Sequence, residues 1–204
     1  MAEDTDVFAL LVYAYHIEYM NCKMFLFPLD TTRAFIDIKA TATKHPVLAR
    51  YVLQFHGLTG DDQIPALFNV GKKKALNTLT CYTNESPKGK SKTGFFNPEI
   101  LGPVGDINAD VNDILAAGSQ FLIGCYGKNY AKSCSTMTEA RIKVWRKKIQ
   151  TGPVKLRYIP PTNESSGENI KRAHLQVAHW KTAITGVPPK LDPNAWGYDS
   201  LNTA

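Results

Sequence analysis

Two pairs of acidic side chains in the first third of the chain have the types and spacing of metal ligands. Asp4 and Asp6 flank Thr5 directly before a run of apolar residues, and Asp61 and Asp62 follow a glycine further on. Mg²⁺ binds oxygen ligands, commonly one or two carboxylates together with water and phosphate oxygens. Each pair taken alone is more typical of a solvated chain end or of a turn than of a metal site.

A glycine followed by lysines comes shortly after the second acidic pair. The segment 64–76 passes through Gly71 into Lys72, Lys73 and Lys74. A glycine lets backbone approach a phosphate, and the start of a helix presents N–H groups and the positive end of its dipole to an anion. The lysines would add a salt-dependent attraction to phosphates. A surface helix that begins with three solvated lysines would have the same sequence.

Basic residues are concentrated in a second segment near the C-terminal end. Residues 1–70 hold five basic and eight acidic side chains, a balance of −3, whereas residues 141–181 hold ten and two, a balance of +8. This asymmetry indicates a polyanionic partner such as nucleic acid. Trp145 in this segment would either stack on a base or pack into the core of a charged helix. The residues expected to contact phosphate here are Arg146, Lys147 and Lys148.

Apolar periodicity predicts the elements that position these side chains. The run 7–12 is typical of a buried strand, and residues 24–27 and 34–38 of a hairpin around a turn at 28–32. Helical spacing predicts helices over 46–55 and 72–79. Further helices are expected over 111–125, 137–149 and 170–184, the second of them starting with a capping box at Thr136 and Glu139.

The predicted fold class is therefore α/β, a partial sheet with helices, followed by a mostly α-helical region. The glycine- and proline-rich stretch between the two parts is interpreted as a linker. The expected division is an α/β region at 1–83, a linker at 84–105, a basic helical region at 106–185 and an irregular tail at 186–204.

The order of these motifs resembles the C-terminal half of the PIN-like 5′-nuclease domain of flap endonucleases and related 5′–3′ exonucleases. The matching pieces are Glu-Asp-Thr-Asp at 3–6, the hairpin ending at 35–38, Gly60-Asp61-Asp62, and Gly71 with its lysines. The chain is more closely similar to uncharacterised animal proteins, associated with mobile elements, that join such a half-domain to a helical C-terminal region. Pro160-Pro161-Thr162 and residues 170–174 belong to that likeness. The resemblance implies that Asp4, Asp6 and Asp62 bind Mg²⁺ and that a helix–hairpin–helix element at Gly71 grips duplex DNA.

The sequence departs from that family at three points, one of which is Asp61 in place of a residue that is usually small or neutral. Asn69 stands where the family hairpin has its first glycine, and asparagine tolerates the left-handed backbone better than most residues. The half-domain that precedes the paired aspartates, with its first strand and further carboxylates, is missing before Met1. Two-metal hydrolysis needs a full carboxylate cluster. The resemblance thus implies an incomplete Mg²⁺-dependent phosphodiesterase with weak or no cleavage by this chain alone, unless a partner chain supplies the missing half.

Two other hypotheses stay open at this point. One is a non-enzymatic binding module that keeps only the hairpin and the basic helices. The other is a structural or interaction protein whose charges are solvated surface. DNA is the expected nucleic acid, although the sequence does not separate DNA from RNA.

Composition bears on the location of the protein. No run approaches the ~18 apolar residues of a membrane span, so no membrane partner is expected. The first six residues are acidic where a signal peptide is basic, and the four cysteines show no CxxC spacing. These features predict an intracellular protein with reduced thiols, and a DNA partner would place it in the nucleus.

Overall fold

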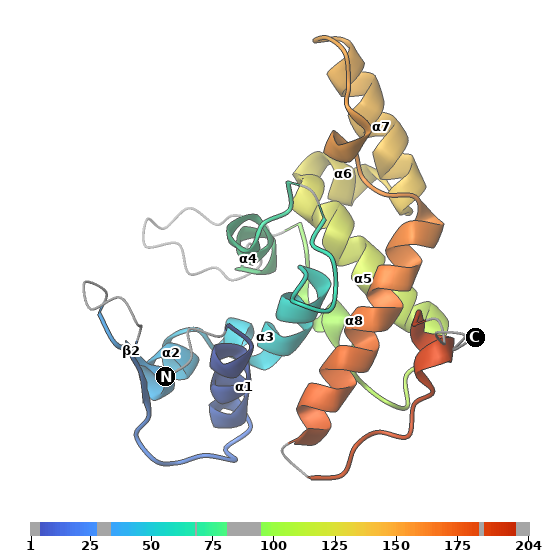
Figure 1. The fold of residues 1–204 in the computed structure, drawn as a ribbon. Coiled ribbons are helices and arrows are strands. Elements are labelled where there is room, and N and C mark those ends of the chain that lie inside the picture. The colour runs from blue at the N-terminus through green and yellow to red at the C-terminus, as the bar shows by residue number, and fades with distance from the viewer. Residues whose placement is uncertain (1–4, 28–33, 68, 81–94, 184–185, 199–204) are drawn as a thin grey trace.

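Helices make up most of the protein in the computed structural model, which describes residues 5–27, 34–67, 69–80, 95–183 and 186–198. The described residues form eight α-helices, three short 3-10 helices and one two-stranded sheet (Figure 1). The predicted helical C-terminal region is confirmed. The N-terminal part is mostly helical as well, and within the described ranges it contains no larger sheet of the PIN-like kind.

The first apolar run forms helix α1 (Thr5–His16), so the prediction of a buried strand over residues 7–12 is wrong. The buried residues Ala9, Val12 and Tyr15 recur every three positions, which is the spacing of one helix face. A short apolar run does not by itself distinguish a buried strand from a buried helix. Here the helix formed by the run, α1, continues for about three turns.

The predicted hairpin is present but short. Strand β1 (Phe25–Leu26) pairs antiparallel with β2 (Ile36–Asp37), and the predicted turn at 28–32 lies outside the described residues. Asp37 then starts helix α2 (Ile38–Lys44), because its carboxylate accepts a hydrogen bond of 2.8 Å from a backbone N–H of the first turn.

The next two helices confirm the sequence prediction. Helix α3 (Pro46–Leu58) has proline at its first position, where no backbone donor is lost, and α4 (Lys72–Thr80) begins at the lysine run. The connection between them turns at Gly60, whose φ of +92° favours glycine. Asn69 adopts a φ of +63°, which is the left-handed conformation that asparagine tolerates better than most residues.

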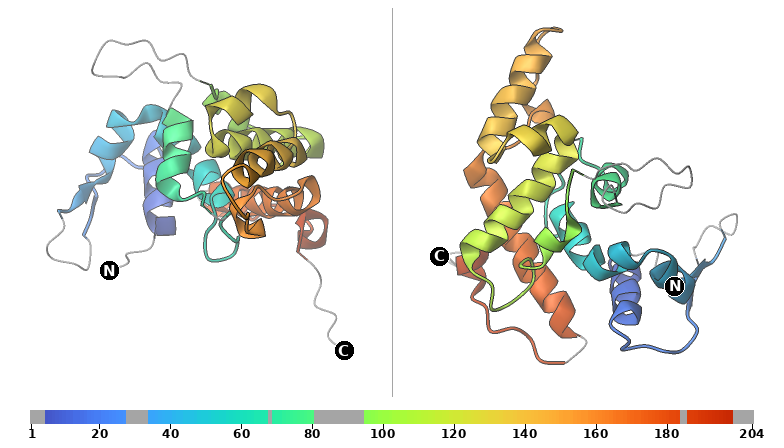
Figure 2. Two further views of the ribbon diagram at one scale, coloured as in Figure 1. Left: turned by 90° about the horizontal axis from the view of Figure 1, so that it is seen from above. Right: turned by 180° about the vertical axis from the view of Figure 1, so that it is seen from behind.

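Four helices and a 3-10 turn form the C-terminal part: α5 (Val111–Tyr126), α6 (Lys128–Ser133), α7 (Met137–Ile149), η2 (Leu156–Tyr158) and α8 (Asn163–Ala183). Helices α5 and α8 lie side by side (Figure 2). They approach closely at Gly118, where a Cβ atom would lie 2.6 Å from the side chain of Ile170.

Helix α7 extends away from the rest of the protein at the top of Figure 1. Its predicted capping box is confirmed, because the Glu139 N–H donates to Thr136 Oγ1 at 3.2 Å. The Glu139 carboxylate in turn accepts from the backbone N–H of Ser135 at 2.8 Å. These two hydrogen bonds fix the start of α7, and the basic residues of the helix follow from there.

Residues of the predicted α/β region and of the predicted helical region contribute to one hydrophobic core. Within the range interpreted as a linker, Phe96, Leu101 and Val104 are buried, and residues Pro98–Leu101 form η1. The described part of the predicted irregular tail includes η3 (Pro193–Trp196), and the Trp196 ring stacks on His174 with ring centres 4.3 Å apart. None of the described helices has the length and apolarity needed to cross a membrane.

Candidate nucleic-acid interface and the adjoining ionic cluster

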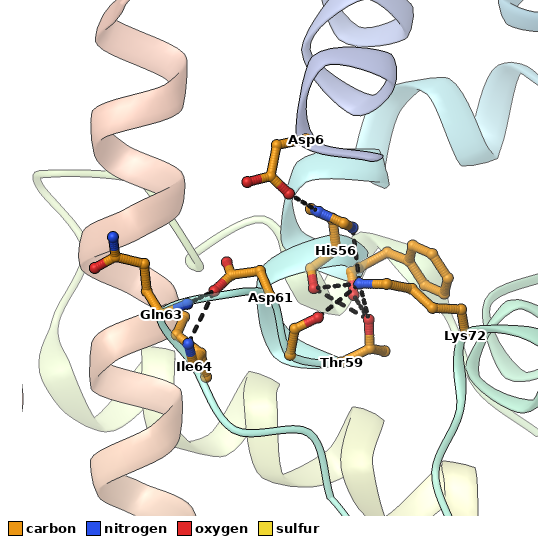
Figure 3. Close-up of polar contacts among 9 residues, drawn as sticks. Asp6, His56, Thr59, Asp61, Gln63, Ile64 and Lys72 are labelled. Carbon is orange, nitrogen blue, oxygen red and sulfur yellow. Dashed lines mark hydrogen bonds and ion pairs between the residues drawn. The ribbon is translucent and has the colours of Figure 1, made fainter. Parts of the chain in front are cut away.

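Asp6, one of the predicted metal ligands, contacts His56 near the end of α3 (Figure 3). The Nε2 and Oδ1 atoms are 2.5 Å apart, and His56 is 3% exposed. The other ring nitrogen, Nδ1, lies 2.8 Å from Lys72 Nζ. Because an ammonium group has only donors, Nδ1 accepts from Lys72 and the Nε2–H donates to Asp6. A neutral imidazole thus links α1, α3 and α4.

The ammonium of Lys72 also satisfies the C-terminal end of α3. The last carbonyls of a helix have no partner within the helix, and a positive charge there complements the helix dipole. Burial lowers the pKa of Lys72, and the nearby carboxylates of Asp61 and Asp6 oppose this effect. Its other acceptors are His56 O at 3.2 Å, Thr59 Oγ1 at 3.1 Å and Gly60 O at 2.7 Å. In this arrangement Lys72, which the sequence predicts to contact phosphate, points into the protein.

The adjacent aspartates Asp61 and Asp62 differ in environment. Asp61 Oδ1 accepts from the backbone N–H groups of Gln63 and Ile64 at 2.8 and 2.9 Å, which fixes the turn after α3. Its Oδ2 atom is buried without a hydrogen-bond partner among the described residues. Asp62 is exposed.

The predicted magnesium ligands are only partly described. Asp4 lies outside the described residues, Asp6 contacts His56, and Asp62 lies on the exposed turn. Among the residues that the structure describes, no group of three or more histidine, cysteine, aspartate or glutamate side chains is arranged to hold a metal ion. The magnesium site at Asp4, Asp6 and Asp62 stays a prediction.

Lys74, Lys147 and Lys148 meet in one groove, although they lie far apart in the sequence. We call this the basic groove. Its main hollow has a volume of about 300 Å³ and is lined by Asn69, Lys74, Tyr126, Tyr130, Val144, Lys147, Lys148, Thr151 and Tyr158. A second hollow of about 200 Å³ shares Lys148, Thr151 and Tyr158 with the first and adds Lys155. No acidic side chain is among the described residues that line either hollow.

The electrostatics of the basic groove favour an anion. Burial lowers the pKa of Lys74, the Cys125 thiol opposes this, and the charge of Lys148 lowers the pKa further. Within the described part of the chain, no carboxylate forms an ion pair with Lys74, Lys147 or Lys148. An anion would therefore relieve the repulsion among these lysines. Burial also raises the pKa of Tyr126 to about 12, so its phenol stays neutral and does not repel that anion.

The other predicted nucleic-acid contacts lie outside the basic groove. Gly71 is exposed, and a Cβ atom there would meet nothing within 4 Å, so this conformation does not require glycine. Lys73 lines a separate apolar hollow among α1, α3 and α4, and Arg146 is exposed on α7. Trp145 is 43% exposed, which rules out the interpretation of a core tryptophan.

The sequence analysis missed the tyrosines of the basic groove. Tyr126 and Tyr130 stand four residues apart, on either side of the Gly127 break between α5 and α6. Tyr158 lies in the basic stretch, beside Arg157. Aromatic residues next to basic residues were a usable signal at Tyr158. Tyr126 and Tyr130 follow the end of the helix predicted over 111–125, where the sequence shows no basic cluster to mark them.

Comparison with known proteins adds no relative. No protein-family model matches the chain, and neither the curated proteins nor the solved structures contain a match.

Proposed function

We propose that this protein binds nucleic acid in the basic groove. The observation that supports this most directly is the convergence of Lys74 with Lys147 and Lys148, together with tyrosines and without an acidic lining residue. Lysines supply phosphate attraction, and half-exposed aromatic rings supply stacking for bases. The proposal requires no catalysis and corresponds to the binding module expected as an alternative from the sequence.

The test is the salt dependence of binding to a fluorescently labelled oligonucleotide of about 16 nucleotides. Anisotropy titrations between about 50 and about 200 mM salt give the slope of log K against log salt. The variant Lys147→Gln/Lys148→Gln is expected to weaken binding. For a single strand it should also reduce the magnitude of the slope by about 1.4, which is about 0.7 for each lost phosphate contact.

The matched control is Lys44→Gln/Lys190→Gln, which removes the same charge from two exposed lysines outside the basic groove. It should change the slope much less than the groove variant. Equal effects of the two variants would mean that only net charge matters and would contradict a site in the groove. Absence of binding at about 50 mM salt would favour a structural or interaction protein.

The relation to 5′ nucleases is a second proposal. The carboxylates of Asp6 and Asp61 each act electrostatically on the Lys72 ammonium beside the α3–α4 connection. Cleavage of a flapped duplex in Mg²⁺, lost in both Asp6→Asn and Asp62→Asn, would support an Mg²⁺-dependent phosphodiesterase. Cleavage that appears only after a second protein is added would support a partner chain. An intracellular, nuclear location stays a prediction as well.

A further inference from the structure

The two hollows of the basic groove are small compared with a nucleic-acid duplex. Their volumes are about 300 and 200 Å³, and they adjoin at Lys148, Thr151 and Tyr158. Pockets for single small molecules start at about 300 Å³. A duplex presents only the edges of its bases in its grooves and keeps the faces stacked. Hollows of this size therefore suit unstacked nucleotides one at a time.

Three tyrosine rings reach the main hollow from three different elements. Tyr126 ends α5, Tyr130 lies in α6 and Tyr158 ends η2, and all three are half-buried. An aromatic ring stacks on the face of any base, and only an unstacked base offers that face. The rings would have little to contact on a duplex, where the basic groove could use only its lysines.

Cations lie over two of these rings. Lys74 Nζ is 5.4 Å from the centre of the Tyr126 ring, and Lys148 Nζ is 5.6 Å from that of Tyr158. On the same tyrosine, Arg157 Cζ is 5.3 Å from the ring centre. A nucleotide carries a flat base and a charged phosphate a short distance apart. A ring and an ammonium this close together match both groups of one nucleotide.

We infer that the basic groove selects single-stranded over double-stranded nucleic acid, with a base stacked on Tyr158 and the neighbouring phosphates held by Lys74 and Lys148. This inference rests on the proposed function and narrows its ligand. Single-stranded DNA and RNA share the base faces and phosphates on which it depends, so the experiment includes both.

The experiment measures binding of wild-type protein to the same sequence as single-stranded DNA, single-stranded RNA and duplex DNA. The informative variant is Tyr158→Leu, and Tyr158→Phe and Tyr158→Trp are the conservative variants that keep a ring. Tyr19→Leu, at a tyrosine that is 64% exposed and outside the basic groove, is the matched control. Tyr130→Leu, on a different element, replaces Tyr158→Leu if that variant lacks a cooperative thermal transition.

At least one single strand should bind about tenfold or more tightly than the duplex. Tyr158→Leu should weaken that binding about 5- to 150-fold, which corresponds to the loss of one stacked base, and should leave the salt slope unchanged. Tyr158→Phe and Tyr158→Trp should retain most of the affinity. A preference for DNA or for RNA would identify which single strand is the ligand.

Duplex that binds as tightly as either single strand would overturn the inference, and so would Tyr158→Leu behaving like Tyr19→Leu. In both cases a reduced salt slope in Lys147→Gln/Lys148→Gln would still support the proposed function. An unchanged slope in that lysine variant would refute the proposed function itself. The two failures are thus distinguishable.

Discussion

Replacing Lys72 by methionine should destabilise the protein. The reason is the loss of hydrogen bonds within the fold, not the loss of a contact to phosphate. Methionine keeps much of the length of the side chain but removes the ammonium that donates to His56 Nδ1 at 2.8 Å and to Gly60 O at 2.7 Å. Both acceptors belong to buried residues. The variant leaves these acceptors in place without their donor.

The magnitude follows from the groups left behind. Each buried acceptor without a donor costs about 1–3 kcal/mol, and the lost charge at the helix end costs about 0.3–1 kcal/mol. The desolvation penalty of the ammonium is removed at the same time, which offsets part of this. Because Lys72 is half-buried, we expect a net loss of about 3 kcal/mol, at the lower end for breaking a buried pair.

Urea unfolding measures this loss. With a slope of about 2 kcal/mol per molar urea, the midpoint should fall by about 1.5 M. Lys73→Met is the control, because Lys73 is the exposed neighbour on the same helical turn, and its effect should stay within about 0.5 kcal/mol. If Lys72→Met unfolds at the same urea concentration as Lys73→Met, the assignment of Lys72 to the end of α3 is refuted.

Three further predictions concern backbone and pH. In urea unfolding, Asn69→Gly should preserve or raise the free energy of unfolding, and Asn69→Ala should lower it by about 1 kcal/mol. The reason is that the φ of +63° at this position suits glycine and strains alanine. In the same assay, Gly105→Ala should lower the free energy of unfolding by about 3 kcal/mol, because the φ of Gly105 is +79° and a Cβ there would lie 2.2 Å from Val177. Gly71→Ala is the control and should leave the free energy of unfolding unchanged. Burial lowers the pKa of His174 from 6.5 to about 4, so the unfolded state binds its proton first as the pH falls. Stability should therefore be complete above about pH 6.5 and fall toward pH 4 by at most about 1.4 kcal/mol per pH unit, and His174→Gln should remove this dependence in thermal melts at several pH values.

Helices with a clear apolar face or a cap were predictable from the sequence. Pro46 marked the start of α3, and Thr136 with Glu139 marked that of α7. The first apolar run was not predictable in the same way, because a short apolar stretch fits a buried strand as well as a buried helix. Its three-residue recurrence at Ala9, Val12 and Tyr15 was the signal that favoured the helix.

The lysine run shows how far side-chain roles can be predicted. Lys72 lies three and seven residues before the buried Ala75 and Leu79, so it shares their face of α4, and Lys73 does not. This spacing was available from the sequence and would have placed Lys72 on the inner side. The meeting of Lys74 with Lys147 and Lys148 was not available, because it depends on how α4 packs against α5 and on where α7 starts.

The ionic cluster and the basic groove are connected through α4. Lys72 holds the first turn of α4 against the end of α3, and Lys74, two residues further on, lines the basic groove above the Tyr126 ring. The bonds of Lys72 to His56 and Gly60 therefore fix the rotation of α4 about its axis, and with it the direction in which Lys74 points. The three consecutive lysines, which look equivalent in the sequence, thus have different tasks: the first positions the helix, the second faces a separate apolar hollow, and the third presents its charge in the basic groove.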